Sequence, residues 1–512
     1  MNYKKKIGII GGGPSGIVSA KTAIECGFDV VIFEKQDDIG GVWSIKNGKA
    51  WDNMKSHISY VSMSFSDYYW DVPEERKPFH PSREEMYQYF YNYCKDFNIL
   101  DKFKLKTNVI DVNQINHTKK WLIKYSTTIN NDGDVEFNEE EFDFIIISTG
   151  FLAKKKEINI KNKFNNFNGK IWTSDQYKNP NHFKDKRVLI IGGLSSGIEI
   201  ACDISNVTKN LYIICNKKSW IVKRRFPNNE LNLPVNDHCI QFRELHYKEM
   251  PDIELNIIKN NILNIISQNQ RENEYFKMTT PDYKTPNLIV SDNFLDILKS
   301  GEIKLINKTI NYCENNNVIF GGENDTTTIE FDDIICCDGY DIDLSFFNDK
   351  IKEKISYDFS YPHMPIVLHK HVFSPDLENI GFIGLFKGAS MIEYEIQARW
   401  AVYCWANISK LPTREQMLHG ISKEFEIRNQ NDPSDIPQFI LKSSIRFCDE
   451  IAKEIGCLPD FEKLKQSDPY LYDILWNKMC HPAAYRLVGP FSNINAEYNI
   501  KNDFNHYYKI DK

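Results

Sequence analysis

Short apolar runs recur along the chain, each bounded by glycine, charged or polar residues. These runs span residues 7–10, 30–33, 144–148, 188–191, 211–214 and 334–337. A short continuous apolar run with turn residues at its ends predicts a strand buried on both faces, as in a parallel sheet. The runs at 7–10 and 188–191 each lead into a glycine-rich turn and then a helical pattern. The pattern therefore predicts two strand–turn–helix units in an α/β fold.

The segments between these units carry other patterns. Apolar residues at helical spacing predict a helix over 84–98. Residues 103–125 alternate between apolar and polar positions, which predicts paired strands. Residues 50–82 are rich in Trp, Tyr, Ser and Pro and predict no simple element.

The first turn has the glycines that a dinucleotide-binding turn requires. It reads Gly11-Gly12-Gly13-Pro14-Ser15-Gly16. Gly11 permits the tight turn, Gly13 lets the backbone approach a pyrophosphate, and Gly16 lets the helix pack on the strand. The helix N-terminus then presents amide groups to the phosphates. Glu34 ends the next apolar run and can accept hydrogen bonds from ribose hydroxyls.

The second turn is a degenerate copy of the first. It reads Gly192-Gly193-Leu194-Ser195-Ser196-Gly197. Leu194 replaces the middle glycine, so we expect a looser site, suited to a cofactor that moves. Lys217 and Lys218 follow the next strand, where basic residues favour a ribose 2′-phosphate over the free hydroxyl of NAD. The alternative is that both lysines are solvated surface charges.

Two dinucleotide turns in one chain suggest two bound dinucleotides, the arrangement of a flavoprotein that a nicotinamide cofactor reduces. We expect two Rossmann-like dinucleotide-binding domains, with the NADP domain inserted into the FAD domain. Residues 1–170 would form the first part of the FAD domain, and 336–512 its second part with a C-terminal extension. Residues 171–335 would form the NADP domain, with an elaboration around 236–300.

Composition excludes several other classes of protein. The chain has 512 residues, of which 42% are hydrophobic and 26% charged, and a formal charge of −7, so nucleic-acid binding is not indicated. We find no signal peptide and no apolar stretch long enough to span a bilayer, and expect no membrane partner. The 12 cysteines form no Cys-x-x-Cys pair, which argues against a dithiol relay and favours the reducing cytoplasm. No spacing of His and Cys predicts a metal site.

Further motifs give the chain a resemblance to the flavin-containing monooxygenases, the class B flavoproteins. Besides the two turns, these motifs are Ile39-Gly40-Gly41-Val42-Trp43, Phe79-His80-Pro81-Ser82-Arg83-Glu84, Lys370-His371-Val372-Phe373, Asn379-Ile380-Gly381-Phe382-Ile383-Gly384, Glu395-Ile396-Gln397-Ala398-Arg399-Trp400, Leu411-Pro412 with Met417, and Tyr485-Arg486-Leu487-Val488-Gly489-Pro490. The resemblance extends from the first turn to about Pro490, which is nearly the whole chain.

Two positions depart from the family's pattern. The family's identifying segment has a histidine where this chain has Thr173, before Tyr177-Lys178. The tyrosine makes ketone oxidation less expected, because relatives that oxidise ketones carry tryptophan there. An asparagine that approaches the flavin's reactive carbon is here His57, by spacing from Trp43. An imidazole can still donate a hydrogen bond to a flavin peroxide. The alternative is that the register differs by one or two residues and His57 is ordinary.

The resemblance implies an NADPH- and O2-dependent monooxygenase that oxygenates an amine nitrogen or a sulfide sulfur of a small molecule through a C4a-hydroperoxyflavin. His57 is the candidate catalytic residue. The implied cofactor-binding residues are Gly11, Gly13, Ser15, Gly16, Glu34, Lys35, Gly41, Trp43, Val109 and Gln397, and, toward NADPH, Tyr177, Gly192, Ser195, Ser196, Gly197, Lys217 and Lys218. The alternatives are an NADPH oxidase or dehydrogenase on the same scaffold, or a non-catalytic redox sensor. The substrate and the oligomeric state, a homodimer among the options, stay open.

Overall fold

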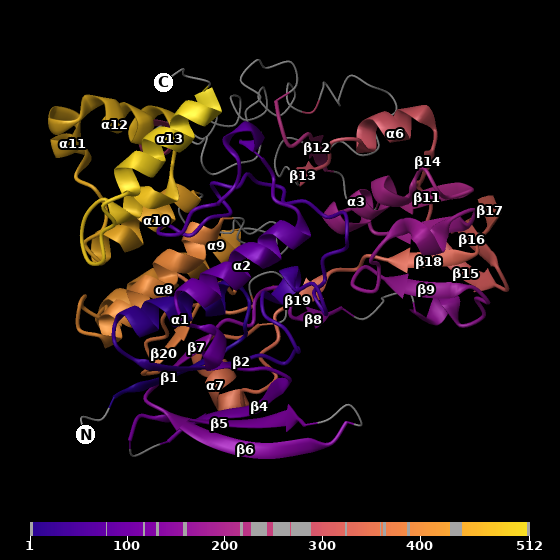
Figure 1. The fold of residues 1–512 in the computed structure, drawn as a ribbon. Helices are drawn as coiled ribbons and strands as arrows, with labels where there is room; N and C mark the ends of the chain where they lie inside the picture. The colour runs from indigo at the N-terminus through magenta and orange to yellow at the C-terminus, as the bar shows by residue number, and fades with distance from the viewer. Residues whose placement is uncertain are drawn as a thin grey trace.

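The computed structural model describes residues 4–77, 79–115, 118–129, 133–156, 161–215, 219–226, 243–248, 267, 288–322, 325–358, 360–361, 365–386, 390–430 and 443–508. Two parallel sheets organise it, one near the N-terminus and one inserted between two visits of the chain to the first (Figure 1). This confirms the predicted α/β fold with two strand–turn–helix units.

The first parallel sheet has the strand order β20-β7-β1-β2-β3. Its strands are β1 (Lys6–Ile10), β2 (Asp29–Phe33), β3 (Phe103–Lys104), β7 (Phe144–Ile147) and β20 (Ile380–Phe382). Phe144 and Ile146 face the helices α1 (Pro14–Glu25) and α8 (Met391–Trp405), whereas Ile145 and Ile147 face an antiparallel sheet. That sheet consists of β4 (Thr107–Gln114), β5 (Trp121–Thr128) and β6 (Val135–Phe142). The β7 run is apolar at every position because both of its faces are covered.

The second parallel sheet repeats this plan with the order β14-β11-β10-β18-β9. Its strands are β9 (Lys170–Thr173), β10 (Arg187–Ile191), β11 (Asn210–Ile214), β14 (Ile303–Ile306) and β18 (Asp333–Cys336). Helices α3 (Ser195–Ile204) and α6 (Phe294–Ser300) cover one face. An antiparallel sheet of β15 (Ile310–Glu314), β16 (Asn317–Gly322) and β17 (Asp325–Glu330) covers the other. The fold thus contains the same three-layer unit twice.

Two short strands link the two units. Another two-stranded sheet follows the strand β11 of the second unit in sequence. β8 (Lys154–Lys155) and β19 (Tyr340–Asp341) pair antiparallel where the chain passes into and out of the second unit. β12 (Trp220–Val222) pairs parallel with β13 (Leu288–Val290), and α4 (Arg243–Tyr247) lies between them in sequence. Most of the predicted elaboration at 236–300 lies outside the described residues. The strands of the second unit run from 170 to 336; the domain boundaries themselves stay a prediction.

Further helices complete the molecule (Figure 1). They are α2 (Arg83–Asp96), α7 (Asp349–Lys354), α9 (Arg414–Gln430), α10 (Ser444–Glu454), α11 (Phe461–Ser467), α12 (Pro469–Asp473) and α13 (Ala496–Tyr508). α2 matches the helix predicted at 84–98 and starts with a capping box between Ser82 and Glu85. Among the described helices, none has the length and apolar character needed to cross a membrane.

Candidate active site

The first glycine turn connects β1 to α1, and its backbone is tightly packed. Gly11 has a φ of 112°, and a Cβ at this position would lie 2.4 Å from the carbonyl oxygen of Ser148. A Cβ at Gly16 would lie 1.9 Å from the carbonyl oxygen of Gly11. Because both clashes are with backbone atoms, these two positions need glycine for the fold itself.

Gly13 differs, because the fold alone does not require glycine there. Its φ is −80°, and a Cβ would meet only the Cα of Gly41, at 3.7 Å. As the N-cap of α1, Gly13 also has no side chain to accept the first amide hydrogens of the helix. Open backbone at a helix N-terminus fits a pyrophosphate. The residues present therefore fit the dinucleotide predicted at this turn.

The Glu34 carboxylate lies against the same turn. It is buried, and its two oxygens accept hydrogen bonds from the amides of Gly12 at 2.7 Å and Gln36 at 2.8 Å. Burial raises the pKa of Glu34, although the two amide donors oppose the shift. Each carboxylate oxygen can accept a second hydrogen bond, so Glu34 can still bind ribose hydroxyls. Lys35 beside it is exposed.

Predicted residues from distant parts of the chain converge on this turn. The Gln397 side chain accepts a hydrogen bond from the Gly384 amide at 3.0 Å, and a Cβ at Gly384 would lie 2.2 Å from the Ser15 hydroxyl. The Gly40 amide donates to the Gly12 carbonyl at 3.0 Å. The next residues, Gly41 to Trp43, form a short 3-10 helix with Trp43 buried. Thr107 donates to the Glu34 carbonyl, which brings β4 and the half-buried Val109 to this edge of the turn.

Replacing Gly13 with valine tests this cradle. Because the extended backbone of Gly13 accepts any residue, we expect a folded protein that binds flavin more weakly. Bulk in a close-packed contact costs about 1–3 kcal/mol, which corresponds to roughly five- to 150-fold weaker flavin binding. Flavin titration of the apoprotein measures this loss, and Leu194→Val at the equivalent position of the second turn is the matched control. Wild-type flavin affinity in Gly13→Val would show that the cofactor lies elsewhere.

The second turn has the same backbone as the first. Gly192 also has a φ of 112°, and a Cβ at Gly197 would lie 1.8 Å from the Gly192 carbonyl oxygen. Leu194 takes the place of Gly13 as the residue before the helix, with a φ of −98°, and its side chain is 43% exposed. Ser195 and Ser196 open α3 and are half-buried. The turn thus keeps its shape because Leu194 needs no left-handed conformation and projects outward.

Cys215 occupies the position in the second unit that Glu34 occupies in the first. A Cβ at Gly193 would lie 2.3 Å from the Cys215 sulfur, just as a Cβ at Gly12 would meet Glu34. Burial raises the pKa of the Cys215 thiol to about 12, so the thiol is neutral. The second turn therefore lacks the acid that would repel a 2′-phosphate. Lys217 and Lys218, predicted to bind that phosphate, lie outside the described residues.

Tyr177 lies in the core of the second unit. It is buried against Trp51 and Phe183, and its hydroxyl donates to Asp203. Asp203 is near the C-terminal end of α3, whereas the turn lies at the N-terminal end, about 12 Å away at 1.5 Å per residue. This geometry does not support the predicted contact of Tyr177 with the nucleotide, which stays a prediction.

The loop that carries His57 is held between the two units. The Ser56 amide donates to the Pro81 carbonyl at 2.7 Å, and Arg224 of the second unit donates to the Ser56 carbonyl at 3.1 Å. Arg224 is buried and also pairs with Glu199 at 2.7 Å and Asp292 at 2.8 Å. His57 itself is half-buried. Arg224 therefore fixes the backbone immediately before His57 relative to the second nucleotide turn.

The C-terminal helix α13 braces the other side of this loop. The Tyr507 hydroxyl donates to Ser59, and the Tyr60 hydroxyl donates to Asp503 at 2.7 Å. His481 contacts the same Asp503 carboxylate at 3.0 Å. The segment after His57 is thus tied to the last helix of the described chain.

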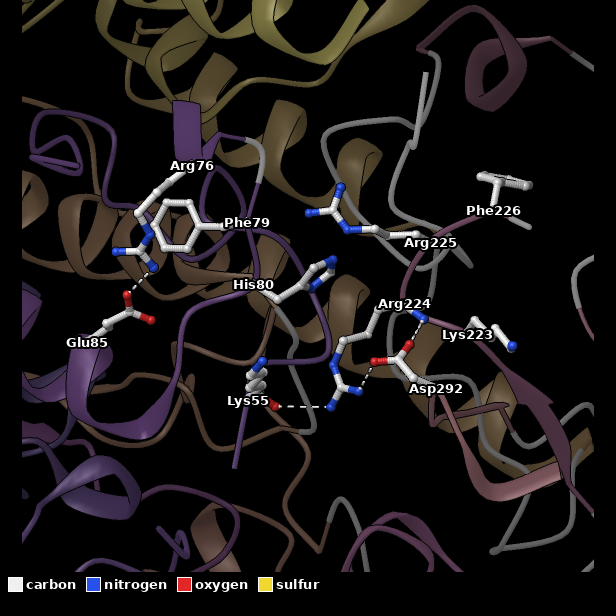
Figure 2. Close-up of a pocket in the computed structure, with 10 residues that line it drawn as sticks. All are labelled: Lys55, Arg76, Phe79, His80, Glu85, Lys223, Arg224, Arg225, Phe226 and Asp292. Atoms are coloured by element: carbon white, nitrogen blue, oxygen red, sulfur yellow. Dashed lines mark hydrogen bonds and ion pairs between the residues drawn. The ribbon is translucent and has the colours of Figure 1, made fainter. Parts of the chain in front are cut away.

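A pocket of about 670 Å³ opens beside this loop (Figure 2). Its lining residues come from both units and are Lys55, Arg76, Phe79, His80, Glu85, Lys223, Arg224, Arg225, Phe226 and Asp292. The volume suits a small ligand. Figure 2 shows the hydrogen bond between Arg224 and the Lys55 carbonyl that joins the two walls. One of its lining residues, Lys55, is two positions before His57 in sequence, and the pocket lies at the junction of the two nucleotide-binding units.

Comparison with known proteins places the whole chain in one group. The sequence model described as "Flavin-binding monooxygenase-like" matches residues 4–510. Dimethylaniline monooxygenase [N-oxide-forming] 4 of Mus musculus is 27% identical over 95% of this chain and 84% of its own length. Flavin-containing monooxygenase 5 of Homo sapiens is 28% identical over 95% of this chain and 89% of its own.

Solved structures share the fold. S-allyl-L-cysteine S-oxygenase from Allium sativum superposes with a TM-score of 0.59 at 19% identity, covering 93% of this chain and 96% of that one. A cyclohexanone-bound cyclohexanone monooxygenase superposes with a TM-score of 0.65 at 14% identity, covering 88% of this chain and 98% of that one. These likenesses confirm the predicted architecture of two dinucleotide-binding units.

Proposed function

We propose that this chain, which belongs to the flavin-binding monooxygenase-like family, uses NADPH and O2 to oxygenate an amine nitrogen or a sulfide sulfur of a small molecule through a C4a-hydroperoxyflavin. Membership of the family makes the chain a flavoprotein monooxygenase with FAD as its flavin. In the proposed reaction one oxygen atom of O2 enters the substrate and the other leaves as water, with two electrons from NADPH. The relatives named for N-oxide formation and S-oxygenation support this substrate class.

The observation that carries the proposal is the pair of similar turns, one of which keeps an acid while the other has lost it. Glu34 beside the first turn suits the ribose of FAD, and Cys215 beside the second leaves room for the 2′-phosphate of NADPH. The flavin supplies the oxygen chemistry when it is bound. The chain supplies the cradle at Gly13, the fixed loop before His57 and a pocket between the units.

A specific observation keeps an NADPH oxidase as the second candidate. Thr173, which stands where the family has histidine, already hydrogen-bonds with Gln176 and receives a hydrogen bond from Lys155. Its hydroxyl is therefore already engaged by Gln176 and by Lys155 of the linking strand β8. The deciding experiment measures NADPH consumption against a panel of amines and sulfides while hydrogen peroxide is counted. Oxygenated product in proportion to NADPH supports the monooxygenase, whereas peroxide in proportion to NADPH with every compound supports the oxidase.

We expect NADPH to be preferred over NADH by more than tenfold. A charge-assisted contact with the 2′-phosphate contributes about 1.5–3 kcal/mol, and every 1.4 kcal/mol is about tenfold. Replacing Lys217 and Lys218 with alanine should raise the KM for NADPH more than the KM for NADH. Steady-state kinetics with both cofactors checks this, and equal effects on the two would remove these lysines from the phosphate site.

We also propose a cytoplasmic location. All cysteines of the described residues are unpaired thiols, which suits a reducing compartment. The state of assembly stays open, and sedimentation of the flavin-loaded protein would test a homodimer.

A further inference from the structure

The strand beside the nucleotide turn ends in the same way in both units. β7 is followed by Ser148-Thr149-Gly150 in the first unit, and β18 is followed by Cys337-Asp338-Gly339 in the second. In both units, the last residue of this strand lies in register with the last residue of the strand that enters the turn. Asp338 of the second unit is therefore the counterpart of Thr149 in the first.

The backbone around Asp338 is fixed against the second turn. The Cys337 amide donates to the Ile191 carbonyl at 2.8 Å, and a Cβ at Gly192 would lie 2.6 Å from the Cys337 carbonyl oxygen. Gly339 has a φ of 88°, and its counterpart in the first unit has a φ of 74°. Asp338 is therefore held between the second nucleotide turn and a glycine in the left-handed region.

The Asp338 carboxylate lacks the partner that a buried acid normally has. Its Oδ2 atom is buried, and no donor among the described residues reaches that atom. Burial raises the pKa of Asp338, and the cation that attracts it, Lys156, forms an ion pair with Asp341 at 3.3 Å. The Thr149 hydroxyl, by contrast, donates to the Asp343 carbonyl at 3.4 Å. Because an unsatisfied buried acceptor is unfavourable, this oxygen indicates a hydrogen-bond donor that belongs to a ligand.

The position of Asp338 in the sheet indicates which part of a ligand it meets. In a doubly wound sheet, a dinucleotide lies across the carboxyl ends of the strands at the point where the strand order reverses. That point lies between β10 and β18, because β11 adjoins β10 on its other side. The adenosine ribose lies toward the end of β11, where Cys215 corresponds to Glu34, so the second ribose lies toward the end of β18. The Asp338 side chain is only half-buried, so a ligand can reach it.

We propose that Asp338 binds the nicotinamide-side ribose of NADPH by accepting hydrogen bonds from its hydroxyl groups. Ribose hydroxyls are the donors that the unsatisfied carboxylate oxygen lacks. The chain passes from Asp338 into β19, which pairs with β8 between the two units, so this ribose lies on the side of the turn that leads to the flavin-binding unit. The inference rests on NADPH binding in the proposed function and adds the residue that holds the nicotinamide half.

The charge of Asp338 gives this role a recognisable sign. The cofactor carries negative phosphates, so removal of a nearby negative charge would by itself strengthen binding. Removal of a hydrogen-bond acceptor in contact with the cofactor weakens binding. Weaker binding in a variant that lacks the Asp338 carboxylate therefore identifies a direct contact.

The test measures the binding of three ligands to the FAD-loaded protein by isothermal titration calorimetry. The ligands are NADP+, 2′-phospho-ADP-ribose, which keeps the second ribose without the nicotinamide, and adenosine 2′,5′-bisphosphate, which lacks that ribose. Asp338→Ala should weaken the first two by about tenfold or more, the size of one hydrogen bond to a charged group, and should not weaken the third. Asp338→Asn keeps one acceptor oxygen and should bind with intermediate affinity. Asp341→Ala, which removes a nearby acid paired with Lys156, is the matched control and should weaken none of the three.

Thermal unfolding of the FAD-loaded protein without nucleotide separates this contact from a structural role. Because the buried oxygen has no partner, Asp338→Ala should be at least as stable as wild type. A less stable Asp338→Ala that binds all three ligands more weakly by the same factor identifies a structural role and overturns the inference. Unchanged affinity for NADP+ and 2′-phospho-ADP-ribose also overturns it. If the ligands bind as expected but no amine or sulfide is oxygenated, the proposed function fails and the ribose contact stands.

Discussion

Arg486→Met should destabilise the protein by about 3–5 kcal/mol, the cost of removing one partner from a buried ion cluster. The Arg486 side chain is 1% exposed and contacts Glu395 and Asp67, each at 2.9 Å. It also donates to the Ser66 hydroxyl at 2.7 Å. The methionine would leave both carboxylates buried without their main partner, so the native state loses more than one hydrogen bond.

The cluster joins four parts of the flavin-binding unit. Lys21 of α1 contacts Asp67 at 2.6 Å, Glu395 belongs to α8, and Arg486 is the last residue of a short 3-10 helix, Pro482–Arg486. Ser66 donates its amide to Glu395 at 2.6 Å. Loss of Arg486 should therefore loosen the 66–67 loop, α1 and α8 together, and with them the cradle at Gly13.

Denaturant unfolding measures the change in the free energy of unfolding. FAD is kept saturating in both proteins, because bound cofactor itself stabilises the folded state. The matched control is Arg414→Met, whose ion pair with Asp376 is mostly exposed and contributes about 1 kcal/mol or less. Equal destabilisation by the two variants would contradict a structural role for the cluster.

The same cluster predicts a dependence on pH. Burial acts to raise the pKa of Asp67, but Arg486 and Lys21 outweigh it and hold that pKa below its ordinary value. A carboxyl whose pKa is lower in the folded state stabilises the fold above its unfolded pKa of about 3.9. That contribution is lost as the pH falls through the lower folded value. The difference in free energy of unfolding between wild type and Arg486→Met should therefore become smaller below about pH 4.

The local parts of the fold could be predicted from sequence. The apolar runs became β1, β2, β7, β10, β11 and β18, because a strand covered on both faces admits few polar residues. The glycine turns were predictable because backbone contacts at Gly11 and Gly16 exclude side chains. These features depend on neighbours within a few residues or on the adjacent strand.

Contacts between distant segments could not be predicted in this way. Arg224 looks like one more basic residue in Lys223-Arg224-Arg225, and only the folded chain brings it to the carbonyl of Ser56. Tyr507 lies in a polar tail and yet donates to Ser59. The position of Cys215 could have been predicted, because it directly follows the apolar run 211–214 as Glu34 directly follows the run 30–33. Sequence periodicity does not encode which loop a distant side chain will meet.

His57→Ala should divert turnover from oxygenated product to hydrogen peroxide. The Ser56 carbonyl is held by Arg224 and the Ser56 amide by Pro81, so the backbone at His57 is positioned before any ligand binds. If the imidazole donates a hydrogen bond beside the flavin, its loss removes one preorganised donor. Comparable losses cost about 2.7–4 kcal/mol, or roughly a hundred- to a thousandfold. We expect flavin content and anaerobic reduction by NADPH to stay near wild type.

The measurement is the fraction of NADPH oxidised that appears as hydrogen peroxide, with a sulfide substrate at saturation. His419→Ala, an exposed histidine of α9, is the matched control. His57→Asn places the family's residue on the same fixed loop, and we expect it to keep or improve the yield of oxygenated product.

Wild type, His57→Ala and His57→Asn together distinguish the two candidate functions. A high product yield in wild type that falls in His57→Ala and returns in His57→Asn supports a monooxygenase in which His57 replaces the family's asparagine. Peroxide as the only product of wild type, with oxygenation appearing in His57→Asn, identifies the natural protein as an oxidase. Equal yields of oxygenated product in wild type, His57→Ala and His57→Asn would show that His57 is not the hydrogen-bond donor. The sequence alignment that placed His57 beside the flavin would then be wrong. Because Arg224 fixes the loop through backbone atoms, none of these side-chain changes should move the loop itself, and the yields report on the imidazole alone.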